Sequence, residues 1–144
     1  MPNEEFVFEG SMGQLSGRLS LPDRPVTHSA IFAHCFTCSK DIPAAKRITS
    51  ALAARGIAVL SFDFTGLGHS DGEFENTNFS SNVEDLLAAA KALEERVAPV
   101  SLLVGHSLGG AAVIAAAPKL SSVKAVATIG APSNPEHLKK LFSE

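Results

Sequence analysis

The chain has 144 residues, with 12 basic and 15 acidic side chains and a formal net charge of −3 at pH 7. This length predicts a single domain over residues 1–144, and a content of 45% hydrophobic and 19% charged residues is typical of a chain that folds around a core. The acidic balance argues against a nucleic-acid partner, which requires a basic surface. The most apolar run, residues 108–117, is too short and too rich in glycine to cross a membrane. We expect a cytoplasmic protein, because the acidic N-terminus does not resemble a signal peptide.

The N-terminal segments predict an antiparallel pair of strands. Residues 6–8 form a short apolar run, and residues 10–13 contain two glycines that indicate a turn. Leu15, Gly17, Leu19 and Leu21 then occupy every second position, which is the period of a half-buried strand. Two prolines within residues 22–25 end this strand, because proline cannot donate to a sheet ladder.

From residue 29 onward, predicted strands alternate with predicted helices. The apolar runs that predict strands are residues 29–33, 57–62, 100–104 and 123–129. The expected helices begin at Asp41, at a Ser81–Glu84 capping box and at Ser107. This alternation predicts an α/β fold with a mostly parallel sheet and helices on both faces. Sheets of this kind bind ligands at the carboxyl ends of their strands, so we look for functional residues there.

The strongest motif is Gly105-His106-Ser107-Leu108-Gly109, which matches G-x-S-x-G. It follows a predicted buried strand and opens a predicted helix, which is the context in which this motif presents a nucleophilic serine. The two glycines are expected because side chains at their positions would collide with the neighbouring strand and helix. The motif therefore predicts Ser107 as the catalytic nucleophile.

The backbone around Ser107 and the loop after the first parallel strand predict an oxyanion hole. The N–H of Leu108 lies at a helix N-terminus, where the helix dipole favours a developing negative charge. The second N–H is assigned to Phe36, and His34 is expected to support that loop. We do not assign His106 as the general base, because adjacent side chains diverge in a tight turn; it is expected to pack and support the turn.

Cys35 and Cys38 form a C-x-x-C pair in the same loop. One interpretation is a redox-sensitive dithiol that would stiffen the loop when oxidised. A metal site is not predicted, because four-coordinate zinc needs a second pair of ligands, and no cofactor is expected. The alternative is that both cysteines are small loop residues without a chemical role.

The segment from Asp63 to Ser70 follows the second parallel strand and contains two glycines. Its spacing matches neither nucleotide-binding glycine motif. Asp63 is either a catalytic acid or, as we favour, a residue that braces the loop. His69 is a second candidate for catalysis, since it belongs to a loop at the catalytic edge.

Taken in chain order, the H-C-F-T, D-F-T-G-L-G-H-S and G-H-S-L-G-G segments resemble the α/β-hydrolase family. The chain is similar, more narrowly, to the hydrolase domain of fusion proteins that carry an OsmC-like peroxidase domain. This resemblance implies a serine hydrolase that acts on a small-molecule ester, thioester or amide. It also implies an OsmC-like domain as a partner, and a catalytic triad in the order serine, acid, histidine.

The acid and histidine of that triad are not found downstream of Ser107. Glu136 and His137 are neighbours in a predicted helix, and adjacent helical residues do not face one another. We therefore expect a domain that is truncated at its C-terminus, with strongly reduced turnover. We also expect an open edge on the last strand that favours a homodimer. The rival interpretation is a non-catalytic module that binds a ligand or partner, with Cys35 and Cys38 as a redox handle.

Overall fold

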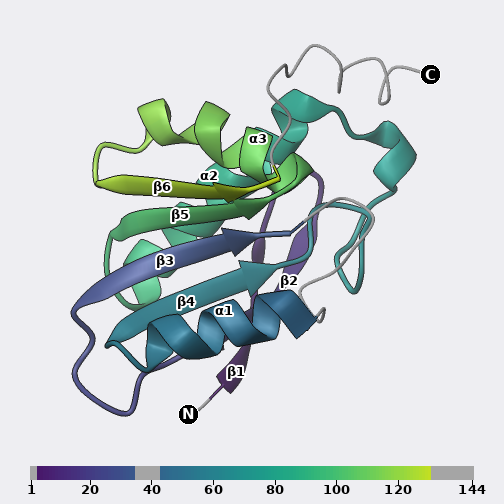
Figure 1. Ribbon diagram of the computed structural model, residues 1–144. Helices are drawn as coiled ribbons and strands as arrows, with labels where there is room; N and C mark the ends of the chain where they lie inside the picture. The colour runs from purple at the N-terminus through teal and green to yellow at the C-terminus, as the bar shows by residue number, and fades with distance from the viewer. Residues whose placement is uncertain (1–2, 35–42, 131–144) are drawn as a thin grey trace.

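A computed structural model describes residues 3–34 and 43–130, which form a six-stranded sheet in the order β1-β2-β4-β3-β5-β6 (Figure 1). The strands are β1 (Asn3–Glu9), β2 (Gln14–Ser20), β3 (His28–Ala33), β4 (Ile57–Phe62), β5 (Val100–His106) and β6 (Ala125–Ile129). The helices are α1 (Pro43–Ala53), α2 (Phe79–Arg96) and α3 (Leu108–Ala116), with short 3-10 turns η1 (Phe74–Asn76) and η2 (Ala117–Lys119). No helix within the described ranges has the length and apolar character needed to cross a membrane.

The sheet is mostly parallel, as the sequence predicts. Strands β4, β3, β5 and β6 run in the same direction, while β1 and β2 form an antiparallel hairpin whose second strand pairs antiparallel to β4. The parallel strands all end at one edge, so the loops that follow β3, β4, β5 and β6 leave the sheet there. These are the loops in which the sequence analysis places the functional residues.

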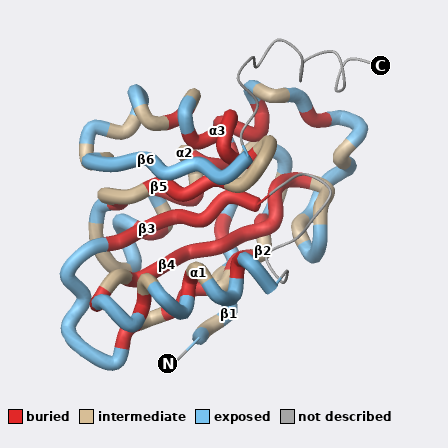
Figure 2. The backbone as a smooth tube through the Cα atoms, in the orientation of Figure 1, coloured by how far each residue is buried: buried red, intermediate tan, exposed pale blue. Residues whose placement is uncertain are grey.

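Helices cover both faces of the sheet (Figure 1). On β3, Ala30 and Phe32 belong to the cluster that contains Ala45 of α1, whereas Ile31 and Ala33 belong to the cluster shared with α2 and α3. Alternate side chains of a central strand therefore point into two separate cores. Figure 2 shows the result as buried central strands flanked by exposed outer segments.

Helix α2 begins earlier than the sequence predicts. Its N-cap is Asn78, whose side chain accepts the Ser81 N–H at 2.8 Å, while the Ser81 hydroxyl accepts the Asn78 N–H at 2.9 Å. The predicted Ser81–Glu84 capping box is therefore wrong. Ser81 completes a box as its third helical residue instead, because Asn78 is an equally good cap three positions earlier.

Strand β6 forms one edge of the sheet and pairs with β5. All five of its residues are exposed, including Val126 and Ile129. Such an edge can add a further strand. The predicted homodimer at this edge stays a prediction.

A buried carboxylate ties α2 to the loops above the sheet. Asp85 is fully buried and accepts four hydrogen bonds. Its Oδ1 accepts the N–H of Ser11 at 2.9 Å and the Ser11 hydroxyl at 2.6 Å. Its Oδ2 accepts the N–H of Thr65 at 2.9 Å and the Thr65 hydroxyl at 2.7 Å. One side chain thus joins α2, the β1–β2 turn and the loop after β4.

We predict that Asp85→Asn lowers the free energy of unfolding by about 2 to 3 kcal/mol. The amide presents an N–H₂ group where the carboxylate accepts two hydrogen bonds, so donors on Ser11 or Thr65 lose their partner. Urea unfolding monitored by circular dichroism measures the change. The control is Glu84→Gln, which alters the exposed neighbouring carboxylate and should change stability by less than about 0.5 kcal/mol. Equal stability of the two variants would contradict the prediction.

Candidate active site

The turn between β5 and α3 places Ser107 in an unusual backbone conformation. Ser107 is the single residue between the two elements and has φ 57° and ψ −119°. Among the described residues it is the only non-glycine with a positive φ. Its N–H donates to the carbonyl of Ile129 on β6 at 2.8 Å, and its carbonyl accepts the Gly110 N–H at 2.9 Å. A side chain in this region costs about 1 to 3 kcal/mol, so the surrounding structure must hold it in place.

The two glycines of the motif are required by close backbone contacts. A Cβ on Gly105 would lie 2.5 Å from the Gly109 carbonyl oxygen and from the Gly110 Cα. A Cβ on Gly109 would lie 2.2 Å from the Ala33 carbonyl oxygen. Contacts this short to backbone atoms cannot be relieved by a side-chain rotation. The first turn of α3 therefore packs directly against the ends of β5 and β3, as the spacing of the motif predicts.

The N-terminus of α3 can stabilise a negative charge beside Ser107. Leu108 is the first residue of this nine-residue helix, and the first N–H groups of a helix have no intrahelical acceptor. Their partial positive charge adds to the helix dipole. The Leu108 N–H, the donor that the sequence predicts, belongs to this first turn; its role in an oxyanion hole stays a prediction.

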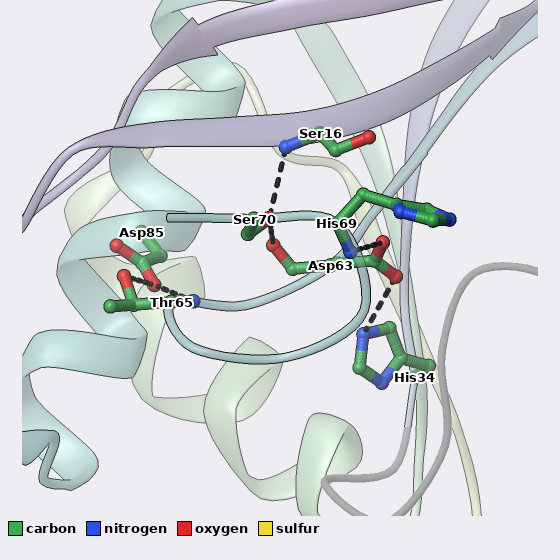
Figure 3. A network of polar contacts seen from close by, with 7 residues as sticks. All are labelled: Ser16, His34, Asp63, Thr65, His69, Ser70 and Asp85. Atoms are coloured by element: carbon green, nitrogen blue, oxygen red, sulfur yellow. Dashed lines mark hydrogen bonds and ion pairs between the residues drawn. The ribbon is translucent and has the colours of Figure 1, made fainter. Parts of the chain in front are cut away.

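His34 lies buried at the carboxyl end of β3, directly before the loop that carries Phe36. Its Nε2 is 3.7 Å from Asp63 Oδ1, and both side chains are fully buried. Its ring packs edge-on against Phe64 with the centroids 5.4 Å apart. Figure 3 shows the imidazole directed at the Asp63 carboxylate. His34 is thus held by the first two residues after β4.

Asp63 braces the loop that follows β4. Its Oδ2 accepts the N–H of His69 at 3.1 Å, and its own N–H donates to the Ser16 carbonyl of β2 at 2.9 Å. The Ser70 hydroxyl donates to the Asp63 carbonyl and accepts the Ser16 N–H, the latter at 2.9 Å (Figure 3). The loop is therefore folded back onto β2 by polar contacts. Bracing is the role of Asp63 that the sequence analysis favours over that of a catalytic acid.

The motifs contain two further histidines, His69 and His106. Within the described residues, neither side chain forms a hydrogen bond with Ser107. His69 is exposed, and Figure 3 shows its ring extending away from Asp63 while its N–H faces the carboxylate. His106 is half-buried in the turn, as expected of a residue that packs there.

Several predicted residues lie outside the described ranges. These are Cys35, Phe36, Cys38, Glu136 and His137. The second oxyanion donor and the dithiol therefore stay predictions. Within the described ranges, no three His, Cys, Asp or Glu side chains are grouped as metal ligands.

Asp85 is not among the residues predicted from the sequence, although the sequence contains a signal for it. Asp85 is spaced by four residues from Ala89 and Ala89 from Leu93, so the carboxylate shares the buried face of α2 with two apolar side chains. A charged residue at such a position is buried only when it is paired or hydrogen-bonded. Its partners, Ser11 and Thr65, are far away in sequence and could not be identified from spacing.

Comparisons with known proteins agree with this geometry. A model of the alpha/beta hydrolase family matches residues 30–141. The crystal structure of an esterase domain from a Rhodothermus marinus protein is 50% identical, covers 95% of the chain and has a TM-score of 0.78. An α/β serine hydrolase without a lid from Xanthomonas campestris is 25% identical over 93% of the chain, with a TM-score of 0.80. No curated protein matches the sequence.

A third similar structure is an α/β serine hydrolase homologue from Coxiella burnetii, which is 25% identical over 98% of the chain and has a TM-score of 0.82. This chain spans 53% of the length of the Rhodothermus marinus structure, 64% of the Xanthomonas campestris structure and 69% of the Coxiella burnetii structure. The similarity therefore concerns about half to two thirds of those proteins.

We predict that Ser107→Gly unfolds at a higher urea concentration than Ser107→Ala. Alanine retains the strain of a positive φ, whereas glycine adopts it freely. Against this, glycine gives the unfolded chain about 0.5 to 1 kcal/mol more conformational entropy, which lowers the stability of the glycine variant. The net difference should be about 1 kcal/mol in favour of glycine, measured from equilibrium unfolding of both variants. If the alanine variant is as stable as the glycine variant, the turn is not strained.

Proposed function

Because the chain belongs to the α/β-hydrolase family, we propose that it is a serine hydrolase that cleaves an ester, thioester or amide bond through an acyl-enzyme on Ser107. The observation that carries this proposal is the strained Ser107 at the carboxyl end of a central strand, directly ahead of the N-terminus of α3. A strained backbone conformation at a single residue costs free energy, and such residues cluster at functional sites. The similar proteins include an esterase domain and serine hydrolases.

In the proposed reaction, the Ser107 hydroxyl attacks the carbonyl carbon of the substrate. The carbonyl oxygen becomes negative and is stabilised by the N–H of Leu108 and, in our proposal, by that of Phe36. One such donor is worth about 3 to 4 kcal/mol in the transition state. Collapse of the tetrahedral intermediate expels the alcohol, thiol or amine and leaves an acylated Ser107, which water then hydrolyses.

A base must take the proton from Ser107 and return it to the leaving group. The buried imidazole of His34 is directed at the Asp63 carboxylate, and the ring of His69 extends away from that carboxylate. We therefore assign neither as the base. The family order places the acid and the histidine after the serine, and the proposal leaves both unassigned.

Labelling with a fluorophosphonate probe tests the proposal. The probe reacts with activated serines, and we expect a mass increase on the peptide that contains Ser107. Ser107→Ala should abolish labelling, because no other hydroxyl in the described chain follows a strand in the same strained turn. Labelling should also stop in urea, because the activated geometry exists only in the folded chain.

The matched control is Ser101→Ala, which removes another serine hydroxyl from β5. The Ser101 hydroxyl donates to the carbonyl of Ser29 and lies away from the carboxyl end of the strand. This variant should label like the unmodified chain. Absence of labelling in the unmodified chain, or equal labelling of Ser107→Ala, would refute the proposed nucleophile.

A further inference from the structure

Two fully buried carboxylates flank the start of the loop after β4, and they face different parts of the molecule. Asp85 accepts hydrogen bonds from Ser11 and Thr65, so it joins this loop to α2 and to the hairpin. Asp63 accepts the N–H of His69 and lies 3.7 Å from His34 Nε2. The two acids thus have different partners (Figure 3). This holds although Thr65, which donates to Asp85, is separated from Asp63 in the sequence only by Phe64.

His34 connects Asp63 to the nucleophile turn through the backbone. A Cβ on Gly109 would lie 2.5 Å from the His34 carbonyl oxygen and 2.2 Å from that of Ala33. The first turn of α3, which contains the Leu108 N–H, therefore packs against the carbonyl of Ala33, the last residue of β3, and that of His34, which follows it. A contact that fixes the position of His34 therefore also fixes the carbonyls against which this turn packs.

Asp63 and His34 lie side by side with both side chains fully buried. Away from water, charges and dipoles at this distance interact far more strongly than they do at the surface. The separation of 3.7 Å exceeds a normal hydrogen bond, so the carboxylate acts on His34 through its charge on the dipole of the imidazole, or on the imidazolium where the ring is protonated. An isosteric amide would keep the shape and remove that charge.

We propose that Asp63 is a positioning residue for Ser107 and acts through His34, while Asp85 stabilises the fold without affecting the nucleophile. This inference rests on the proposed function, in that it assigns to Asp63 an effect on the reactivity of Ser107. The His34 imidazole, held by Asp63 and Phe64, sets the position of the β3 carbonyls. Those carbonyls set the position of the α3 N-terminus beside Ser107.

The first test compares Asp63→Asn with Asp85→Asn. Both remove the charge of a fully buried carboxylate, and both should lower the unfolding temperature. Asp63→Asn should also reduce the rate constant of fluorophosphonate labelling at saturating probe, by about tenfold to a hundredfold, because small displacements of reacting groups have effects of this size. Asp85→Asn, measured at a temperature where it is fully folded, should label within about twofold of the unmodified chain.

The second test is a double-mutant cycle with His34→Gln. If Asp63 acts through His34, each single variant lowers the labelling rate constant, and the double variant is no slower than the slower single variant. Independent roles would instead multiply the two effects. Should Asp63→Asn fail to fold, His34→Gln alone decides the matter, since it must show the same loss of rate while remaining folded.

The third measurement does not depend on any reaction at Ser107. Amide ¹H and ¹⁵N chemical shifts of Leu108 and Gly109 should change in Asp63→Asn and His34→Gln, and should stay unchanged in Asp85→Asn. If the unmodified chain does not label but these shifts follow the expected pattern, the proposed nucleophile fails and the positioning contact stands. Unchanged Leu108 and Gly109 shifts in Asp63→Asn, or a labelling rate equal to that of Asp85→Asn, would overturn the inference.

Discussion

The close packing of α3 against the end of β3 is the constraint on which the site depends. The Gly109 backbone lies so near to the carbonyls of Ala33 and His34 that no side chain fits between them. The chain must reverse from strand to helix within one residue, and Ser107 therefore takes a positive φ. The same reversal directs the first N–H groups of α3 toward the edge of the sheet where ligands bind in this class of fold. The strain at Ser107 and the position of the helix N-terminus beside it thus share one cause.

A strained turn persists only when its surroundings are rigid, and the composition of α3 supplies this rigidity. Most of the helix consists of glycine and alanine, and six of its nine residues are buried. Small residues allow the helix axis to approach the sheet closely, and Ala112 and Val113 are completely buried in the core shared with α2. A bulkier helix would stand further from the sheet and relax the turn. The burial of α3 therefore offsets the cost of the Ser107 backbone.

The parallel strands and the strand–turn–helix context of Ser107 could be predicted from the sequence because both have local signals. Apolar runs mark buried strands, and two glycines around a serine mark a tight turn. The start of α2 was missed, since Asn78 and Ser81 are both acceptable caps and only the three-dimensional structure shows which is used. The contact between His34 and Asp63 joins residues 29 positions apart, and neither residue alone indicates its partner. The OsmC-like fusion stays a prediction.

The forces that hold the sheet differ from those that hold the edge at which Ser107 lies, and this difference bears on the proposed function. Burial of apolar side chains stabilises the sheet, and this interaction has no preferred direction and tolerates small changes in side-chain shape. The edge is held by hydrogen bonds and buried charges on Asp63 and Asp85, which depend on direction and on the removal of water. A substitution in the core therefore alters mainly how much of the chain is folded. A substitution of Asp63, which contacts His34, can leave the chain folded and still displace the N–H groups beside Ser107. Asp63, a buried carboxylate in the loop above the sheet, is for this reason a better candidate for control of reactivity than the larger apolar residues beneath it.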